Sequence, residues 1–293
     1  MLKQVFISGI AVLLGGYCFY RNEGKDIESI SYEIKSKKIP KEFDGFKIVQ
    51  ITDLHNRSFG TDNNILLDEI NKLNPDIVCI TGDLIDGASK DFNIALRLID
   101  ELSKKYRVYH IIGNHEQKTM INKNKDLYKD YFKQLNRKNI INLDNEKVKI
   151  ERKGKFINLY GLIVPYKYYP YLFNKNYKNK NLDFNKDDVY NHLGKINKEE
   201  YNILLVHTPF FFEGYANWGA DLVLSGHVHG GIIRLPIVGG VLSPNREFFP
   251  KYDLGEYNID KSTMILSKGL GGSRILVRVN CKPEIVEITL KCK

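Results

Sequence analysis

The sequence lacks the cysteine patterns that bind zinc or carry out thiol redox chemistry. Its 293 residues include only four cysteines, and no two of them form a C-x-x-C pair or another ligand spacing. We expect Cys79 to be a small buried thiol, because it lies within the apolar run 77–80. Cys281 and Cys292 are candidates for a disulfide if the chain lies outside the cytoplasm.

The chain also lacks an internal repeat and a strip of interleaved basic and aromatic residues that would follow a nucleic-acid backbone. Its net charge of +9 favours anionic partners such as phosphate esters, nucleic acid or acidic lipids. Lysine and asparagine are nevertheless abundant along the chain, notably over 122–198, so a solvated lysine-rich surface explains the charge. We therefore do not expect nucleic acid as a partner.

The N-terminal region contains sixteen consecutive residues without a charge, from Val5 to Tyr20. This run is slightly shorter than the about 20 residues that a membrane-spanning helix needs. No small-x-small cleavage site follows it, which favours a retained segment over a cleaved signal peptide. We predict that residues 1–25 are a membrane anchor or uncleaved signal segment, and that residues 26–293 form one domain outside the cytoplasm. The sequence does not indicate an oligomeric state.

Apolar segments typical of strands alternate with amphipathic segments typical of helices, a pattern that predicts a layered α/β fold. Strands are predicted at 46–51, 77–81, 108–112, 148–150, 156–162, 203–206, 222–224, 263–266, 275–279 and 285–290. Helices are predicted at 63–73, 91–105 and 127–135. Residues 30–34 alternate and predict an edge strand, and the stretch 166–200, rich in Tyr, Asn and Lys, is predicted to be an excursion from the core.

Five polar clusters follow predicted strands. They are Asp53 with His55, Gly82 with Asp83, the run Gly113 to Glu116, His207, and His227 with His229. A single Asp after a strand is more often a turn former, and a single His is more often a packed core residue. Together, however, the clusters use five of the seven histidines. Because the carboxyl ends of strands in α/β sheets converge, we expect the clusters to meet, with both residues of Asp-x-His and His-x-His on one side of a strand end.

The combination of carboxylate, imidazole and amide ligands predicts a metal centre. Such a mixed set suits Mn, Fe or Zn, whereas an all-oxygen set would suit Mg or Ca. Seven candidate ligands exceed the needs of one tetrahedral ion. Two ions about 3.5 to 4 Å apart would use them, with a shared carboxylate and a bridging water as the nucleophile for attack on phosphorus.

The five clusters resemble, in the same order, the signature of the calcineurin-like metallophosphoesterase superfamily: D-x-H, G-D-x-x-D, G-N-H-[DE], H and G-H-x-H. In this chain the motifs are 53–55, 82–86, 113–116, His207 and 226–229. Segments 230–231, 234–236 and 281–285 also resemble a membrane-associated bacterial branch, although Ile232 stands where Gln is expected. The resemblance implies a four-layer α/β/β/α sandwich of two mixed sheets flanked by helices, here preceded by the predicted membrane segment.

The same resemblance implies a role for each candidate residue. Asp53, His55 and His229 would hold the first metal, Asp83 would bridge, and Asn114, His207 and His227 would hold the second. His115 would protonate the leaving alkoxide, and Asp86 would orient His115. The implied activity is hydrolysis of a phosphomonoester or phosphodiester, with a lipid-linked or nucleotide-linked phosphate at the membrane as candidate substrate. The alternative is a membrane-attached metal-binding protein without catalysis.

Overall fold

The computed structural model describes residues 26–89, 91–121, 125–136, 140–169, 183–231, 234–235, 239–240, 249–272 and 281–293. The predicted anchor at 1–25, the predicted strand at 275–279 and Ile232 lie outside these residues. Within the described parts of the chain, none of the helices has the length and apolar character needed to cross a membrane.

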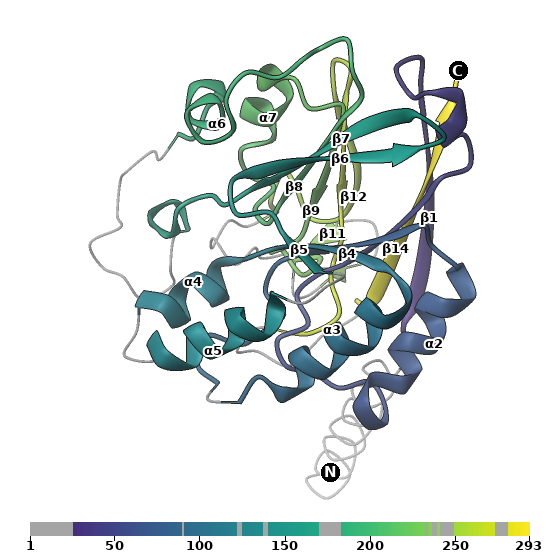
Figure 1. Ribbon diagram of the computed structural model, residues 1–293. Coiled ribbons are helices and arrows are strands. Elements are labelled where there is room, and N and C mark those ends of the chain that lie inside the picture. Colours follow the sequence, from purple (N-terminus) through teal and green to yellow (C-terminus); the bar gives the residue numbers. More distant parts are fainter. Residues whose placement is uncertain are drawn as a thin grey trace, which may run out of the picture.

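The first of two sheets has six strands and mixed direction (Figure 1). Its order is β1 (Glu28–Ser36), β14 (Glu284–Cys292), β2 (Lys47–Ile51), β3 (Ile77–Thr81), β4 (Arg107–Ile111) and β5 (Ile140–Asn142). Strands β2 to β5 are parallel, β14 is antiparallel to β2, and β1 pairs in parallel with β14. The edge strand predicted at 30–34 is therefore confirmed.

The second sheet also has six strands. Its order is β12 (Gly255–Ile259), β13 (Ser262–Leu266), β9 (Leu222–Ser225), β8 (Asn202–Val206), β7 (Lys155–Leu162) and β6 (Glu146–Arg152). The four central strands are parallel and the two outer strands are antiparallel to their neighbours. A short ribbon of β10 (Arg234–Leu235) and β11 (Gly239–Gly240) is separate from both sheets.

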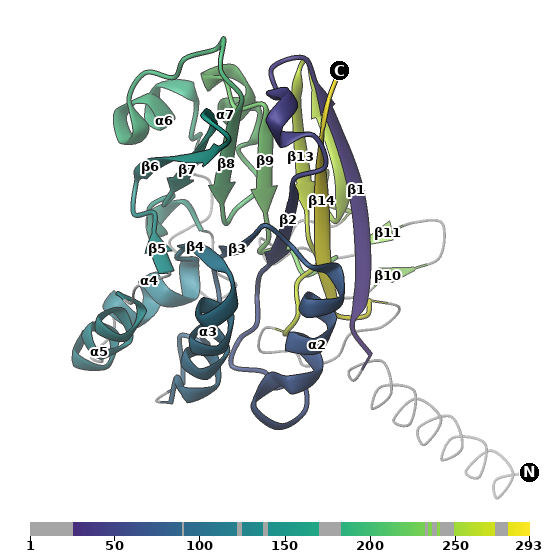
Figure 2. The same ribbon diagram turned by 45° about the vertical axis from the view of Figure 1, so that its right-hand side comes forward.

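Helices lie on both outer sides of the paired sheets, as Figures 1 and 2 show. The helices are α2 (Asn64–Leu73), α3 (Asn93–Lys105), α4 (Asn114–Ile121), α5 (Lys125–Leu135), α6 (Lys186–Leu193) and α7 (Phe212–Trp218), with the short 3-10 helices η1 (Lys41–Phe43), η2 (Thr61–Asn63) and η3 (Tyr166–Tyr168). One apolar cluster lies between the sheets, and two others join each sheet to its helices. The predicted four-layer α/β/β/α sandwich is therefore confirmed.

The excursion predicted at 166–200 is partly wrong, because much of its described portion packs on the second sheet. Helix α6 buries Val189, and Phe184 and Tyr169 are buried in the same apolar cluster. Asn185 caps α6 by accepting the backbone N–H of Asp187. The stretch therefore contributes to the outer helical layer.

Cys281 and Cys292, the two candidates for a disulfide, are both free thiols. Cys79 is buried in β3, as predicted. The buried thiol of Cys281 donates to the carbonyl oxygen of His229, whereas Cys292 is exposed. Cys281 and Cys292 therefore do not pair.

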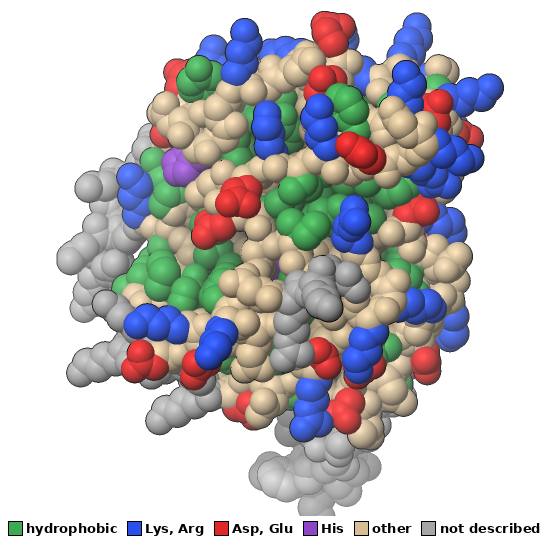
Figure 3. All heavy atoms as spheres, in the orientation of Figure 1, with side chains coloured by type: hydrophobic (Ala, Val, Ile, Leu, Met, Phe, Trp, Pro, Cys, Tyr) green, Lys and Arg blue, Asp and Glu red, His purple; other side chains and the backbone are tan. Residues whose placement is uncertain are grey.

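The surface carries charges of both signs. Figure 3 shows Lys and Arg side chains interspersed with Asp and Glu on the face seen in Figure 1. On this face the excess of lysine produces no region of a single sign, which agrees with the solvated surface expected from the sequence.

Candidate metal centre

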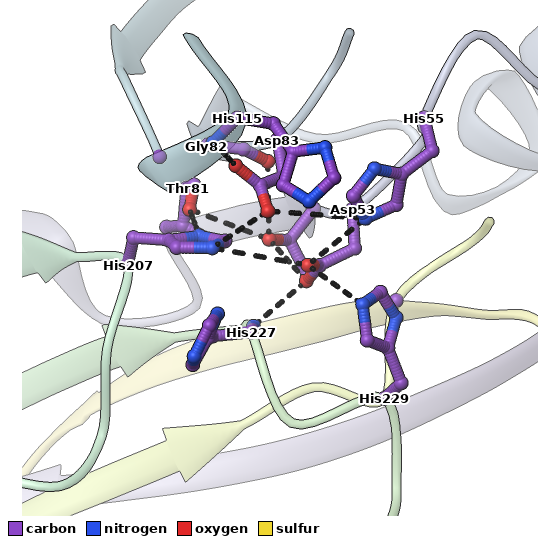
Figure 4. Close-up of polar contacts among 12 residues, drawn as sticks. Asp53, His55, Thr81, Gly82, Asp83, His115, His207, His227 and His229 are labelled. Atoms are coloured by element: carbon purple, nitrogen blue, oxygen red, sulfur yellow. Dashed lines mark hydrogen bonds and ion pairs between the residues drawn. The ribbon is translucent and has the colours of Figure 1, made fainter. Parts of the chain in front are cut away.

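The predicted aspartate and histidine ligands come together where strands of both sheets end (Figure 4). The turns after β2, β3 and β4 bring Asp53, Asp83 and Asn114 from the first sheet. The turns after β8 and β9 bring the histidines from the second sheet. Three groups have ligand atoms mutually within 4.8 Å, namely Asp53 with His55 and His229, His55 with Asp83 and His115, and Asp83 with His207 and His227.

Asp53 is the centre of the first group. Its Oδ1 lies 3.7 Å from His55 Nε2 and 3.6 Å from His229 Nε2. Its Oδ2 accepts the backbone N–H of His227 at 2.9 Å and the hydroxyl of Thr52 at 2.8 Å. One carboxylate oxygen is thus held by the protein while the other faces imidazoles.

Asp83 lies between the two sides of the centre. Its Oδ2 is 3.1 Å from His207 Nε2 and 3.8 Å from His55 Nε2. Its Oδ1 accepts the backbone N–H of His115 at 2.8 Å. The carboxylate therefore faces histidines of both groups, the arrangement that a bridging ligand needs.

The donor set fits divalent cations. His207 Nδ1 lies 2.7 Å from the carbonyl oxygen of Thr81, so this nitrogen donates and Nε2 is left to face the centre. Among the buried side-chain atoms without a hydrogen-bond partner in the described residues, four belong to predicted ligands: Asp53 Oδ1, His55 Nε2, Asn114 Oδ1 and His207 Nε2. Buried polar atoms of this kind are costly unless a partner is supplied, and bound cations would supply one to these four.

The ligand turns have unusual backbone conformations. Five of the seven predicted ligands have a positive φ: Asp53 (53°), His55 (49°), Asp83 (53°), His227 (76°) and His229 (54°). Non-glycine residues rarely adopt this region, and such strain concentrates at functional sites. The expectation that Asp-x-His and His-x-His use strand alternation is therefore wrong, because these ligands lie in turns beyond the strand ends.

Two glycines permit the turns to approach each other. Gly82 has a φ of 94°, and a Cβ there would lie 2.6 Å from the backbone nitrogen of Gly113. A Cβ on Gly113 would in turn collide with Oδ1 of Asp83. The glycine of each motif is thus required by close packing.

Opposite charges dominate the electrostatics of the centre. Burial alone would raise the pKa values of Asp53 and Asp83, but the neighbouring histidines outweigh it and both pKa values are lowered. Burial would lower the pKa of His207, yet the charges of Asp83 and Asp53 raise it to about 9. Burial and the charge of Asp83 raise the pKa of Glu116 to about 7. The cluster therefore attracts positive charge.

His115 lies at the edge of the centre beside Asp86. Its Nδ1 accepts the backbone N–H of Gly87 at 3.1 Å, and Oδ1 of Asp86 is 3.4 Å from the same nitrogen. The pKa of Asp86 is lowered, chiefly because of its interaction with His115. With Gly87 on Nδ1, Nε2 carries the proton of the neutral ring. The structure thus places the predicted proton donor and its partner together.

Gln50 is a residue of the centre that the sequence interpretation missed. Its Nε2 donates to Thr81 Oγ1 at 2.9 Å and to the carbonyl oxygen of Ser225 at 2.9 Å. It therefore joins β2 to β3 and to β9 of the opposite sheet, directly before three ligand turns. The signal was a single amide within the apolar strand KIVQI.

Aromatic side chains pack against His207 and His227. The Tyr169 ring is 5.2 Å from the His227 ring and 6.2 Å from the His207 ring, between centroids. The Phe210 ring is 5.9 Å from the His227 ring. Tyr169 is buried and, through these ring contacts, lines the side of the centre formed by His207 and His227.

Comparison with a family model and with known proteins identifies the family of this chain. Residues 46–231 match the family model described as calcineurin-like phosphoesterase. The metallophosphoesterase YkuE of Bacillus subtilis is 29% identical, over 99% of this chain and 96% of that protein. A Danio rerio protein described as a transmembrane protein with metallophosphoesterase domain is 27% identical, over 92% of this chain and 59% of that protein. The structure of phosphopantetheinyl hydrolase from Mycobacterium tuberculosis aligns with a TM-score of 0.45 and 11% identity, covering 78% of this chain and 91% of that one.

Proposed function

The chain belongs to the calcineurin-like phosphoesterase family and is a hydrolase of phosphoester bonds, and from this premise we propose that it binds two divalent cations for that reaction. Asp53, His55 and His229 would hold one cation, and Asn114, His207 and His227 would hold the other, with Asp83 available to both. The observation that carries the proposal is the convergence of buried aspartate and histidine ligand atoms within 4.8 Å of one another. The mixed nitrogen and oxygen donors favour Mn, Fe or Zn.

The protein's own residues supply orientation and a proton. When bound, the cations polarise the phosphoryl oxygens and lower the pKa of a bound water. His115 donates its Nε2 proton to the leaving alkoxide oxygen. The form suited to this step is the imidazolium, whose Nδ1–H would donate to the Asp86 carboxylate. In the neutral ring, Nδ1 instead accepts the N–H of Gly87.

The test is hydrolysis of a nitrophenyl phosphate monoester and diester by the purified full-length chain in detergent. We expect activity that a chelator abolishes and that added Mn²⁺ restores, with two ions bound per chain. The variant Asp83→Asn should fold, as judged by circular dichroism, and lose most of the activity. Two bound ions without any turnover would instead support the alternative of a metal-binding protein without catalysis.

We also propose that residues 1–25 anchor the chain in a membrane, with the domain formed by 26–293 outside the cytoplasm. The uncharged run from Val5 to Tyr20 supports this. So does the description of the Danio rerio relative as a transmembrane protein. Membership of a membrane-associated branch is part of the same proposal. A reporter fused after Lys293 that is active only in the cytoplasm would contradict the orientation.

The candidate substrate is a phosphoester carried by a membrane lipid. Strand β1 begins at Glu28, whose carboxylate is 2.6 Å from Lys268 Nζ. The loop after Lys268 reaches the centre, where Gly271 N–H donates to the carbonyl oxygen of Asp53. A chain leaving the membrane at residue 25 would thus hold the metal centre close to the lipid surface.

Two substrates distinguish the possible sources of the phosphate. The chain reconstituted in vesicles should hydrolyse a phosphomonoester lipid in the same bilayer faster than a soluble nucleotide-linked ester at equal bulk concentration. Faster hydrolysis of the soluble ester would contradict the lipid-linked substrate. It would not affect the proposal that the chain binds two cations.

A further inference from the structure

Glu116 is a fully buried carboxylate that the reaction described above does not use. It follows His115 in α4, and both of its oxygens accept backbone hydrogen bonds. Oε2 accepts the N–H of Asp83 at 3.0 Å and the N–H of Gly113 at 2.8 Å, while Oε1 accepts the N–H of Ile85 at 3.2 Å. We propose that Glu116 is a positioning residue that joins the turn carrying Asp83 to the turn carrying Asn114, and thereby sets metal affinity.

The connection runs in both directions. Asp83 Oδ1 accepts the N–H of His115, and Glu116 Oε2 accepts the N–H of Asp83. These bonds hold Asp83 in its left-handed conformation, with φ at 53°. Its second oxygen, Oδ2, is then left facing His207 and His55. The position of the proposed bridging oxygen therefore depends on Glu116.

Only an acceptor group satisfies this environment. Three N–H donors point at the side chain, and a carboxylate offers two oxygens and no hydrogen. A glutamine would turn an NH₂ group toward at least one of those donors and leave a buried N–H unpaired. An aspartate keeps the charge but is one methylene shorter, so it would reach one turn and not both.

Glu287 provides a matched control for a purely structural role. It is also buried and lies in β14 of the first sheet. It accepts the hydroxyl of Ser31 at 2.8 Å and forms an ion pair with Lys47 Nζ at 2.7 Å. It contacts none of the predicted ligands in these bonds. Loss of this carboxylate should lower stability without changing metal affinity.

The experiment is calorimetric titration of Mn²⁺ into the chelator-treated full-length chain and into Glu116→Gln, Glu116→Asp and Glu287→Gln. We expect Glu116→Gln to weaken binding about 10- to 100-fold at one or both sites, as loss of outer-shell partners typically does. Glu116→Asp should weaken binding less, and Glu287→Gln should bind like wild type. Activity of Glu116→Gln should rise with excess Mn²⁺.

The outcomes separate this inference from the function on which it rests. If wild type binds no ions, the proposed metal centre is wrong. If wild type binds two ions and Glu116→Gln binds them equally tightly, the positioning role is wrong and the centre stands. Should Glu116→Gln fail to fold, wild-type affinity in Glu116→Asp would overturn the inference.

Discussion

His110 should make the fold sensitive to acid. The side chain is fully buried in β4, and its Nδ1 lies 2.9 Å from Oδ1 of Asn142. The Asn142 amide in turn donates to Asn136, which orients its oxygen toward the imidazole. Nδ1 therefore carries the proton of the neutral ring. A charged ring would also need an acceptor at Nε2, which has no hydrogen-bond partner among the described residues.

The size of the effect follows from the pKa of His110. Burial lowers this pKa from 6.5 to about 4, and the bond to Asn142 offsets the burial only in part. Between pH 6.5 and pH 4 the unfolded chain therefore binds a proton that the native state excludes. The contribution of neutral His110 to the free energy of unfolding is complete above pH 6.5 and is lost as the pH falls toward 4. Each pKa unit is about 1.36 kcal/mol, which gives about 3 kcal/mol in total and about 2 kcal/mol by pH 5.

The assay is urea unfolding at pH 7 and pH 5 in the presence of chelator, for wild type, His110→Gln and His192→Gln. Wild type and His192→Gln should lose the same free energy of unfolding between these pH values. His110→Gln should lose about 2 kcal/mol less, because position 110 then carries no group that titrates. An equal loss in all three proteins would refute the reasoning.

Three further outcomes are expected. His115→Ala should slow hydrolysis of an alkyl phosphate about 100-fold or more. It should slow hydrolysis of a nitrophenyl ester much less, because the nitrophenolate leaving group needs little protonation. Equal losses for the two esters in initial-rate assays would show that His115 is not the proton donor. Gln50→Leu should lower the free energy of unfolding by about 1–3 kcal/mol in urea titrations, because Thr81 and Ser225 lose a buried partner, whereas the exposed control Gln134→Leu should not. Mn²⁺ at about 100 times its dissociation constant should stabilise the chain by about 2.7 kcal/mol per ion in thermal unfolding, and an unchanged transition would argue against binding to the native state.

The strands around the centre were predictable because their apolar runs are continuous and end in polar turns. Strand β3 is Ile77–Thr81, as predicted, and its five residues are all buried because layers cover both faces of the sheet. The helices α6 and α7 were not predicted. They are eight and seven residues long, and such short segments show little periodicity.

The identity of the ligand residues was also predictable, but their conformations were not. The motifs bring together chemically matched side chains, and in the structure Asp53 Oδ1 and Asp83 Oδ2 lie 3.9 Å and 3.1 Å from His207 Nε2. Positive φ values at Asp53 and Asp83 result from contacts between turns far apart in the sequence. Local patterns carry no information about such contacts, so the sequence suggested strand alternation.

The centre exists only when the two sheets pack on each other. Asp53 and Asp83 come from turns of the first sheet, whereas His207 and His227 come from turns of the second. Hydrogen bonds cross this boundary at the ligands themselves, since Asp53 accepts the N–H of His227 and His207 donates to Thr81. A cation held by both sets of side chains would therefore bind the packed sandwich and not either half alone. Metal affinity and sheet packing are for this reason expected to respond to the same substitutions.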